Sequence, residues 1–137
     1  DRRVCQRPVR ELDEKKHLAE TASGHLERDG EQTYEADITG IRGNAFRAVL
    51  GEELILEYRD GRFEMRFKSR AKDSVSAGRG LRYKEMPELT DVKILADISS
   101  VEVFLNGGEY VFTTRYYPKK PGICVDAHDA EIRFWEI

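Results

Sequence analysis

Hydrophobic and polar residues alternate along most of this chain from Thr33 to its end. Successive side chains of a β-strand point to opposite faces, so alternation with a period of two indicates strands that bury one face. The runs are short and are separated by glycine, proline, asparagine or aspartate. The pattern predicts strands at residues 33–41, 46–50, 54–58, 63–67, 92–96, 101–105, 111–115, 123–127 and 131–137.

Two pairs of these strands are joined by typical hairpin turns. Asp60-Gly61 separates residues 54–58 from 63–67, and Asn106-Gly107-Gly108 separates residues 101–105 from 111–115. Asp-Gly and Asn-Gly favour the left-handed backbone conformation that tight hairpin turns require. Many short strands with frequent turns predict an all-β fold, an antiparallel two-sheet β-sandwich of the jelly-roll or concanavalin-like kind.

The first thirty residues have a different composition. Val9 to Glu20 is rich in Glu, Lys, Leu and Ala and predicts a short helix or a docked arm. Ser23-Gly24 and Asp29-Gly30 predict turns that close this segment. We therefore divide the chain into a connector (1–30) and a β-sandwich domain (31–137). Within the domain, Ala71 to Gly80 is predicted to be a mobile loop.

Composition narrows the function only slightly. The net charge of -3 gives no basic footprint for nucleic acid. No apolar run reaches the length of a membrane helix, so we expect no membrane partner. The chain starts at Asp1 without a leader, and we expect it to be cut from a longer protein. For Cys5 and Cys124 we prefer two free thiols to a bridge between the ends, which favours a reducing compartment.

Asp126, His128, Asp129 and Glu131 offer oxygen and nitrogen atoms that could bind a metal ion. The alternative is a tight polar turn between the last two strands, where aspartate is favoured for backbone reasons. We prefer the turn because no second ligand cluster is visible. We therefore expect no metal site and no cofactor.

Asp97 and Glu102 form a second cluster with Ser99 and Ser100. Paired carboxylates can cleave glycosidic bonds as acid and nucleophile. Asp and Ser at a strand junction, however, usually bond their own backbone. Glu102 alternates with valines and points away from their face. We prefer the structural interpretation, and known nucleophile, zinc-protease and nucleotide-binding motifs are missing from the sequence.

Aromatic residues near the end of the chain form a third cluster. We interpret Phe112 and Trp135 as core residues, because aromatic side chains on sandwich strands bury large apolar areas. Tyr110, Tyr116 and Tyr117 are candidates for binding a substrate sugar by stacking, with burial in the core as the alternative.

One stretch is more specific than these clusters. Residues 94–109 read ILADISSVEVFLNGGE and continue through Val111, Thr113, Arg115 and Tyr117-Pro118. This stretch resembles a signature of glycoside hydrolase family 32, which includes invertases, sucrose-6-phosphate hydrolases, levanases and inulinases. The segment QRPVREL (6–12), the hairpin around Asp60-Gly61 and the ending FWEI (134–137) resemble the family in the same order.

The resemblance implies the β-sandwich that follows a five-bladed catalytic propeller in these enzymes. The family's Asn-Asp-Pro-Asn, Arg-Asp-Pro and Glu-Cys motifs are not in this chain: Asn44 and Asn106 do not precede Asp, and Arg59-Asp60 is followed by Gly61. We therefore expect no catalytic residues here, and a structural domain that stabilises the propeller of a sucrose- or fructan-hydrolysing enzyme.

The same resemblance suggests the partners. Residues 1–30 would connect to the propeller of the same polypeptide, with Gln6, Pro8, Val9 and Leu12 in the interdomain contact. A second copy, forming a dimer, is a further candidate partner. By family analogy we expect a bacterial cytoplasmic protein, with secretion as the alternative. The competing hypothesis is a free-standing carbohydrate-binding module that uses the tyrosines.

Overall fold

The computed structural model describes residues 17–42, 45–68 and 81–137. Strands are the regular elements of these ranges, and all pairings are antiparallel. No helix among the described residues is long and apolar enough to cross a bilayer. In chain order the strands are β1 (His17–Asp29), β2 (Tyr34–Thr39), β3 (Phe46–Leu50), β4 (Leu54–Arg59), β5 (Arg62–Phe67), β6 (Arg82–Glu85), β7 (Asp91–Ala96), β8 (Ser100–Leu105), β9 (Tyr110–Arg115) and β10 (Gly122–Glu136).

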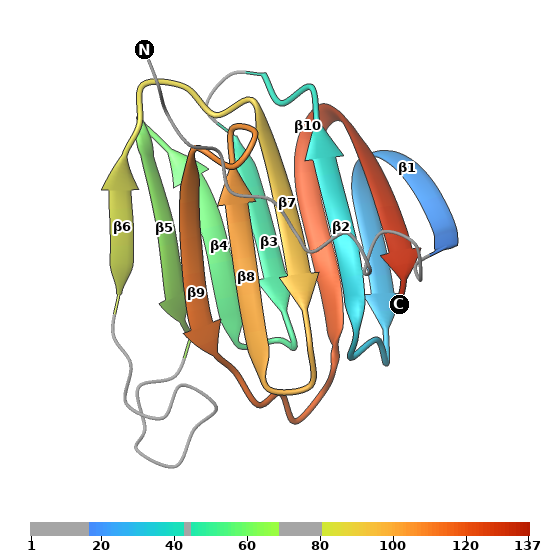
Figure 1. Ribbon diagram of the computed structural model, residues 1–137. Helices are drawn as coiled ribbons and strands as arrows, with labels where there is room; N and C mark the ends of the chain where they lie inside the picture. The colour runs from blue at the N-terminus through green and yellow to red at the C-terminus, as the bar shows by residue number, and fades with distance from the viewer. Residues whose placement is uncertain (1–16, 43–44, 69–80) are drawn as a thin grey trace.

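The strands form one continuous sheet that folds over into two facing layers. The hydrogen-bonded order is β6-β5-β4-β3-β10-β2-β7-β8-β9, and β1 pairs with β10. Figure 1 shows β7, β8 and β9 lying in front of β3, β4 and β5. We call the layer with β3 to β6 the back layer and the layer with β2, β7, β8 and β9 the front layer. The predicted all-β sandwich is confirmed.

Strand β10 belongs to both layers. Ile123 to Asp126 pair with β3, whereas Glu131 to Glu136 pair with β2. The strand bends between these halves, where Asp129 adopts a left-handed φ of 61°. The sequence prediction of two strands separated by a turn was wrong here. The polar residues at the bend mark a change of layer within one strand, which alternation alone cannot distinguish from a turn.

Strand β1 runs beside β10 over nearly the full length of both strands. The segment predicted as a short helix or a docked arm is strand in its described part, residues 17–20, and the sheet extends into the segment assigned to the connector. Ser23-Gly24 is a bulge within β1 rather than a turn, since the register shifts between Ser23 and His25. Helix propensity is a weak preference that pairing with a neighbouring strand overrides. The remainder of the predicted connector lies outside the described residues.

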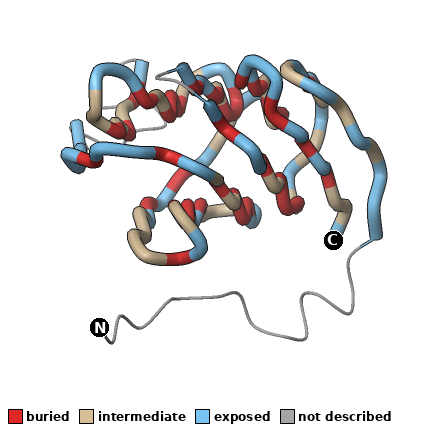
Figure 2. Tube along the Cα trace, turned by 90° about the horizontal axis from the view of Figure 1, so that it is seen from above, coloured by how far each residue is buried: buried red, intermediate tan, exposed pale blue. Residues whose placement is uncertain are grey.

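The core lies between the two layers, where the inward-facing residues, which alternate along each strand, meet. Figure 2 shows buried positions recurring between exposed ones along the strands of both layers. The Tyr58 hydroxyl at the rim donates a hydrogen bond of 2.8 Å to the Met86 carbonyl, so this buried polar group is satisfied. The largest fully buried side chains are Tyr34, Tyr58, Phe46, Phe63, Phe134, Leu26, Ile38, Leu50, Leu54, Leu56, Met65 and Met86.

Both predicted hairpins are confirmed. Asp60 and Gly61 have φ values of 54° and 76° and join β4 to β5. Asn106 and Gly107 have φ values of 52° and 70° and begin the connection from β8 to β9. Strand β6 was not predicted, because its four residues are all exposed and carry no alternating pattern. The predicted loop at Ala71 to Gly80 falls outside the described residues.

Gly51, in the turn from β3 to β4, is fixed by two constraints. Its φ is +58°, and its N–H donates to the Gly122 carbonyl at 2.9 Å. A Cβ at this position would collide with the Tyr116 hydroxyl and would lie 2.7 Å from Cβ of Pro118. Gly107 shares the positive φ, at +70°, but a Cβ there would meet nothing within 4 Å.

Gly51→Ala should therefore destabilise the domain more than Gly107→Ala. Backbone strain alone should cost about 1 kcal/mol at Gly107, and strain plus overpacking should cost about 2–4 kcal/mol at Gly51. Urea unfolding of the two variants measures the difference. Equal losses of stability would contradict the packing of Tyr116 and Pro118 against this turn.

Candidate functional site

Asp97 and Glu102, the candidate carboxylate pair, lie at the hairpin between β7 and β8. Oδ1 of Asp97 accepts a hydrogen bond of 2.7 Å from the Ile98 N–H, and the Asp97 N–H donates to the Ser100 carbonyl at 2.9 Å. Glu102 is exposed on the outer face of β8. Asp97 thus has the local backbone role that the sequence analysis preferred for it.

The three candidate tyrosines differ in exposure. Tyr116 is only 3% exposed, and burial raises the pKa of its hydroxyl well above the ordinary value. Tyr117 is 48% exposed, and its hydroxyl accepts a hydrogen bond of 3.2 Å from Nη1 of Arg115. Tyr110 is half-buried, with the Lys84 ammonium 5.0 Å from its ring centre.

These tyrosines do not form one platform. Tyr110 begins β9 and the other two follow its end, and six residues of strand span about 20 Å. A sugar ring stacked on Tyr110 cannot reach Tyr117 at the other end of β9. The buried ring of Tyr116 offers no face to a ligand. Of the predicted core residues, Phe112 packs against Phe63 with ring centres 5.2 Å apart.

The polar cluster at the end of the chain lies along the bend of β10 and separates into pairs. His128 lies 3.2 Å from Asp129, and Arg133 lies 2.7 Å from Glu131. Asp126 contacts a residue that is far from it in the sequence: its Oδ1 accepts a hydrogen bond of 2.6 Å from Nδ1 of His25 in β1. The pKa of His25 is raised by this hydrogen bond first and by the negative charge of Asp126 second.

Cys124 completes a group that the sequence analysis missed. The ligand atoms of His25, Cys124 and Asp126 all lie within 4.8 Å of one another. Desolvation by burial is the largest cause that raises the pKa of the Cys124 thiol, followed by the charges of Asp126 and Glu27. Only a prediction of β1 as the neighbour of β10 could have revealed this group, since its members come from opposite ends of the chain.

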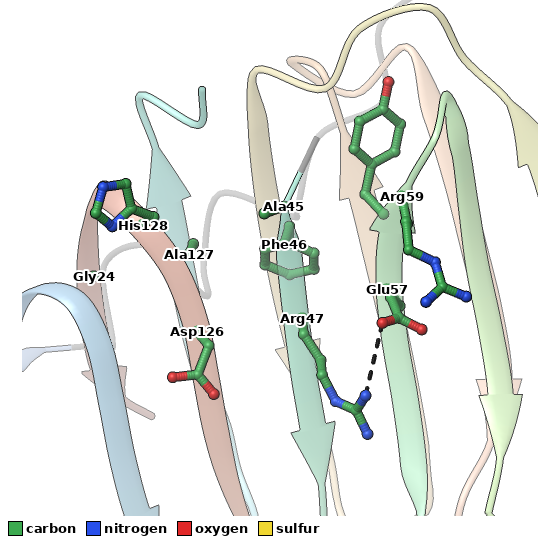
Figure 3. Close-up of a pocket in the computed structure, with 10 residues that line it drawn as sticks. Gly24, Ala45, Phe46, Arg47, Glu57, Arg59, Asp126, Ala127 and His128 are labelled. Atoms are coloured by element: carbon green, nitrogen blue, oxygen red, sulfur yellow. Dashed lines mark ion pairs between the residues drawn. The ribbon is translucent and has the colours of Figure 1, made fainter. Parts of the chain in front are cut away.

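A hollow of about 410 Å³ lies beside this group, at the bend of β10. Figure 3 shows Arg47 of β3 facing Glu57 of β4 within it, and their side chains form an ion pair of 3.6 Å. The hollow also exposes Asp126 and His128. Its walls carry charges of both signs, from Arg47, Glu57, Arg59 and Asp126.

The predicted interdomain residues Gln6, Pro8, Val9 and Leu12 lie outside the described residues. The chain enters the described structure at His17, and the next residue, Leu18, is 46% exposed. Leu18 pairs in register with the half-buried Trp135, and Ile137, two residues further along, is 37% exposed. We name Leu18, Trp135 and Ile137 the apolar edge.

Comparison with known structures gives related folds at low sequence identity. Sucrose-6-phosphate hydrolase from Lactobacillus gasseri aligns with a TM-score of 0.81 and 19% identity, over 97% of this chain and 30% of its own. A family 32 glycoside hydrolase from Bifidobacterium adolescentis aligns with a TM-score of 0.75 and 15% identity, over 95% of this chain and 23% of its own. A family 32 β-fructofuranosidase from Bombyx mori aligns with a TM-score of 0.72 and 16% identity, over 98% of this chain and 30% of its own.

This chain therefore spans 30% or less of the length of these three proteins. None of the curated proteins matches it. The profile described as "Glycosyl hydrolases family 32 C terminal" matches residues 52–136, which is more than half of the chain. The chain belongs to the C-terminal domain family of the family 32 glycosyl hydrolases.

Proposed function

We propose that this chain is the non-catalytic C-terminal domain of an enzyme that hydrolyses sucrose, sucrose 6-phosphate or fructans. The match to the family's C-terminal domain over residues 52–136 carries the proposal. The similar solved structures include a sucrose-6-phosphate hydrolase and a β-fructofuranosidase. The family's catalytic motifs are missing from the sequence, so the reacting carboxylates would belong to a propeller in the same polypeptide.

The domain would act by covering apolar surface on that propeller. The apolar edge supports this role, because it lies beside the point at which the chain enters the described structure, and its residues Leu18 and Ile137 are partly exposed. Burial of such side chains stabilises an interface between two domains of one chain. The propeller without this domain would expose the complementary apolar surface and would aggregate.

The chain alone should release no fructose from sucrose, sucrose 6-phosphate or inulin. The parent enzyme cut back to its propeller should be recovered mainly as aggregate, whereas the uncut enzyme should elute as a defined species with activity. Gel filtration and a fructose assay on the three proteins test this. Fructose release by the chain alone, abolished by Asp97→Asn, would overturn the non-catalytic role.

Leu18→Glu should destabilise the parent enzyme by about 1–3 kcal/mol, because a charge would replace an apolar side chain buried in the interface. Leu81→Glu is the matched control, since Leu81 is similarly exposed, at 41%, but precedes β6, the end strand of the sheet order, which β5, β4 and β3 separate from β10. Thermal unfolding of both variants gives the comparison. Equal losses of stability in the two variants would contradict the proposal that the apolar edge lies in the interface.

A free-standing carbohydrate-binding module is the competing function. Tyr116 is buried, so the exposed ring of Tyr117 is the candidate sugar contact at the end of β9. Such a module would retain fructan binding as the isolated chain and lose it in Tyr117→Ala. The same measurement on Tyr83→Ala, an exposed tyrosine on β6, controls for the general loss of an aromatic surface residue.

A further inference from the structure

We propose that His25, Cys124 and Asp126 form a binding site for a zinc ion on the outer face of the β1/β10 pair. This inference is independent of the proposed function. It departs from the sequence analysis, which expected no metal site, because the ligands come from two strands whose pairing the sequence did not reveal.

The strand register places the three side chains together. His25 is paired with Asp126, and Glu27 is paired with Cys124. The residues between them, Leu26 and Val125, are buried in the core, so the four paired side chains project from the opposite, outer face. Directly opposed residues have Cβ atoms about 4.5–5.5 Å apart, which lets two strands supply ligands to one ion.

The ligand atoms need only small movements to surround an ion. Zinc binds sulfur at about 2.3 Å and nitrogen or carboxylate oxygen at about 2.0–2.2 Å, so tetrahedral ligands stand about 3.3–3.7 Å apart. The three ligand atoms now lie within 4.8 Å of one another, with Nδ1 of His25 2.6 Å from Oδ1 of Asp126. Side-chain rotation can separate the hydrogen-bonded pair and bring the sulfur closer without moving either strand.

The chemistry of the donors selects the ion. A thiolate, an imidazole and a carboxylate together suit zinc, whereas calcium and magnesium prefer oxygen ligands alone. Three protein ligands leave one position of a tetrahedron for water. The side chains of His25 and Asp126 are 55% and 62% exposed, so an ion from solution can reach them.

Neighbouring charges favour a cation at this place. Glu27 lies beside Cys124 in the register and adds negative charge. Arg47 is paired with Asp126 from the other side and would oppose a cation. Its guanidinium is, however, drawn to Glu57 at 3.6 Å, as Figure 3 shows. A bound ion would join β1 to β10 next to the bulge at Gly24, and so would fasten β1 to the strand that both layers share.

Cobalt(II) titration of the 137-residue chain tests the site, because cobalt reports a thiolate ligand by its charge-transfer absorption. Cys5→Ser serves as the background, which leaves Cys124 as the single thiol. We expect thiolate absorption and tetrahedral visible bands that zinc abolishes by displacement. Zinc at about ten times its Kd should raise Tm by about 5 °C.

Variants assign the ligands. Cys124→Ser should abolish the charge-transfer band, and His25→Gln and Asp126→Asn should each weaken binding at least tenfold. His128→Gln changes another exposed histidine, which lies in β10 two residues after Asp126. This substitution should leave the affinity for the ion within about twofold. Melting in a chelator shows that each variant is folded. No thiolate absorption in the Cys5→Ser chain, or equal weakening by His25→Gln and His128→Gln, would overturn the proposal.

Discussion

The backbone hydrogen bonds of β10 hold the two layers of the sandwich together. Its first half pairs with β3 in the back layer and its second half with β2 in the front layer, while β1 follows it along the other edge. Residues from this strand, such as Val125 and Phe134, therefore enter the core on both sides of the bend. Because the strand cannot shift its register in one layer without shifting it in the other, it fixes how the layers face each other.

The same strand places the features that bear on function. Its start carries Cys124 and Asp126 opposite Glu27 and His25 of β1, and its bend forms one wall of the hollow in Figure 3. Its end carries Trp135 opposite Leu18, in the apolar edge. The candidate ion site and the candidate docking surface are thus two ends of one β1/β10 ribbon. An ion bound at the first would stiffen the ribbon that presents the second.

Local patterns predicted much of this fold. The alternation at residues 54–58 and 63–67 and the Asp60-Gly61 turn specify a hairpin without help from the rest of the chain, and the structure contains it. Strand β1 could not be predicted in the same way, because its first residues favour a helix and Ser23-Gly24 favours a turn, and both gain their strand conformation only by pairing with β10. The group of His25, Cys124 and Asp126 was hidden for the same reason. Tyr116 shows a second limit, since the sequence cannot reveal that its hydroxyl packs against the turn at Gly51.

The size of the native polypeptide tests the central claim most directly. An antibody raised against this chain can be used to blot fractionated extract of the source cells, with sucrose-cleaving activity measured in the same fractions. If the chain is the C-terminal domain of a family 32 enzyme, the band should be several times larger than 15.8 kDa and should follow the activity. A band at 15.8 kDa, separate from the activity, would show that the chain works alone and would contradict the account.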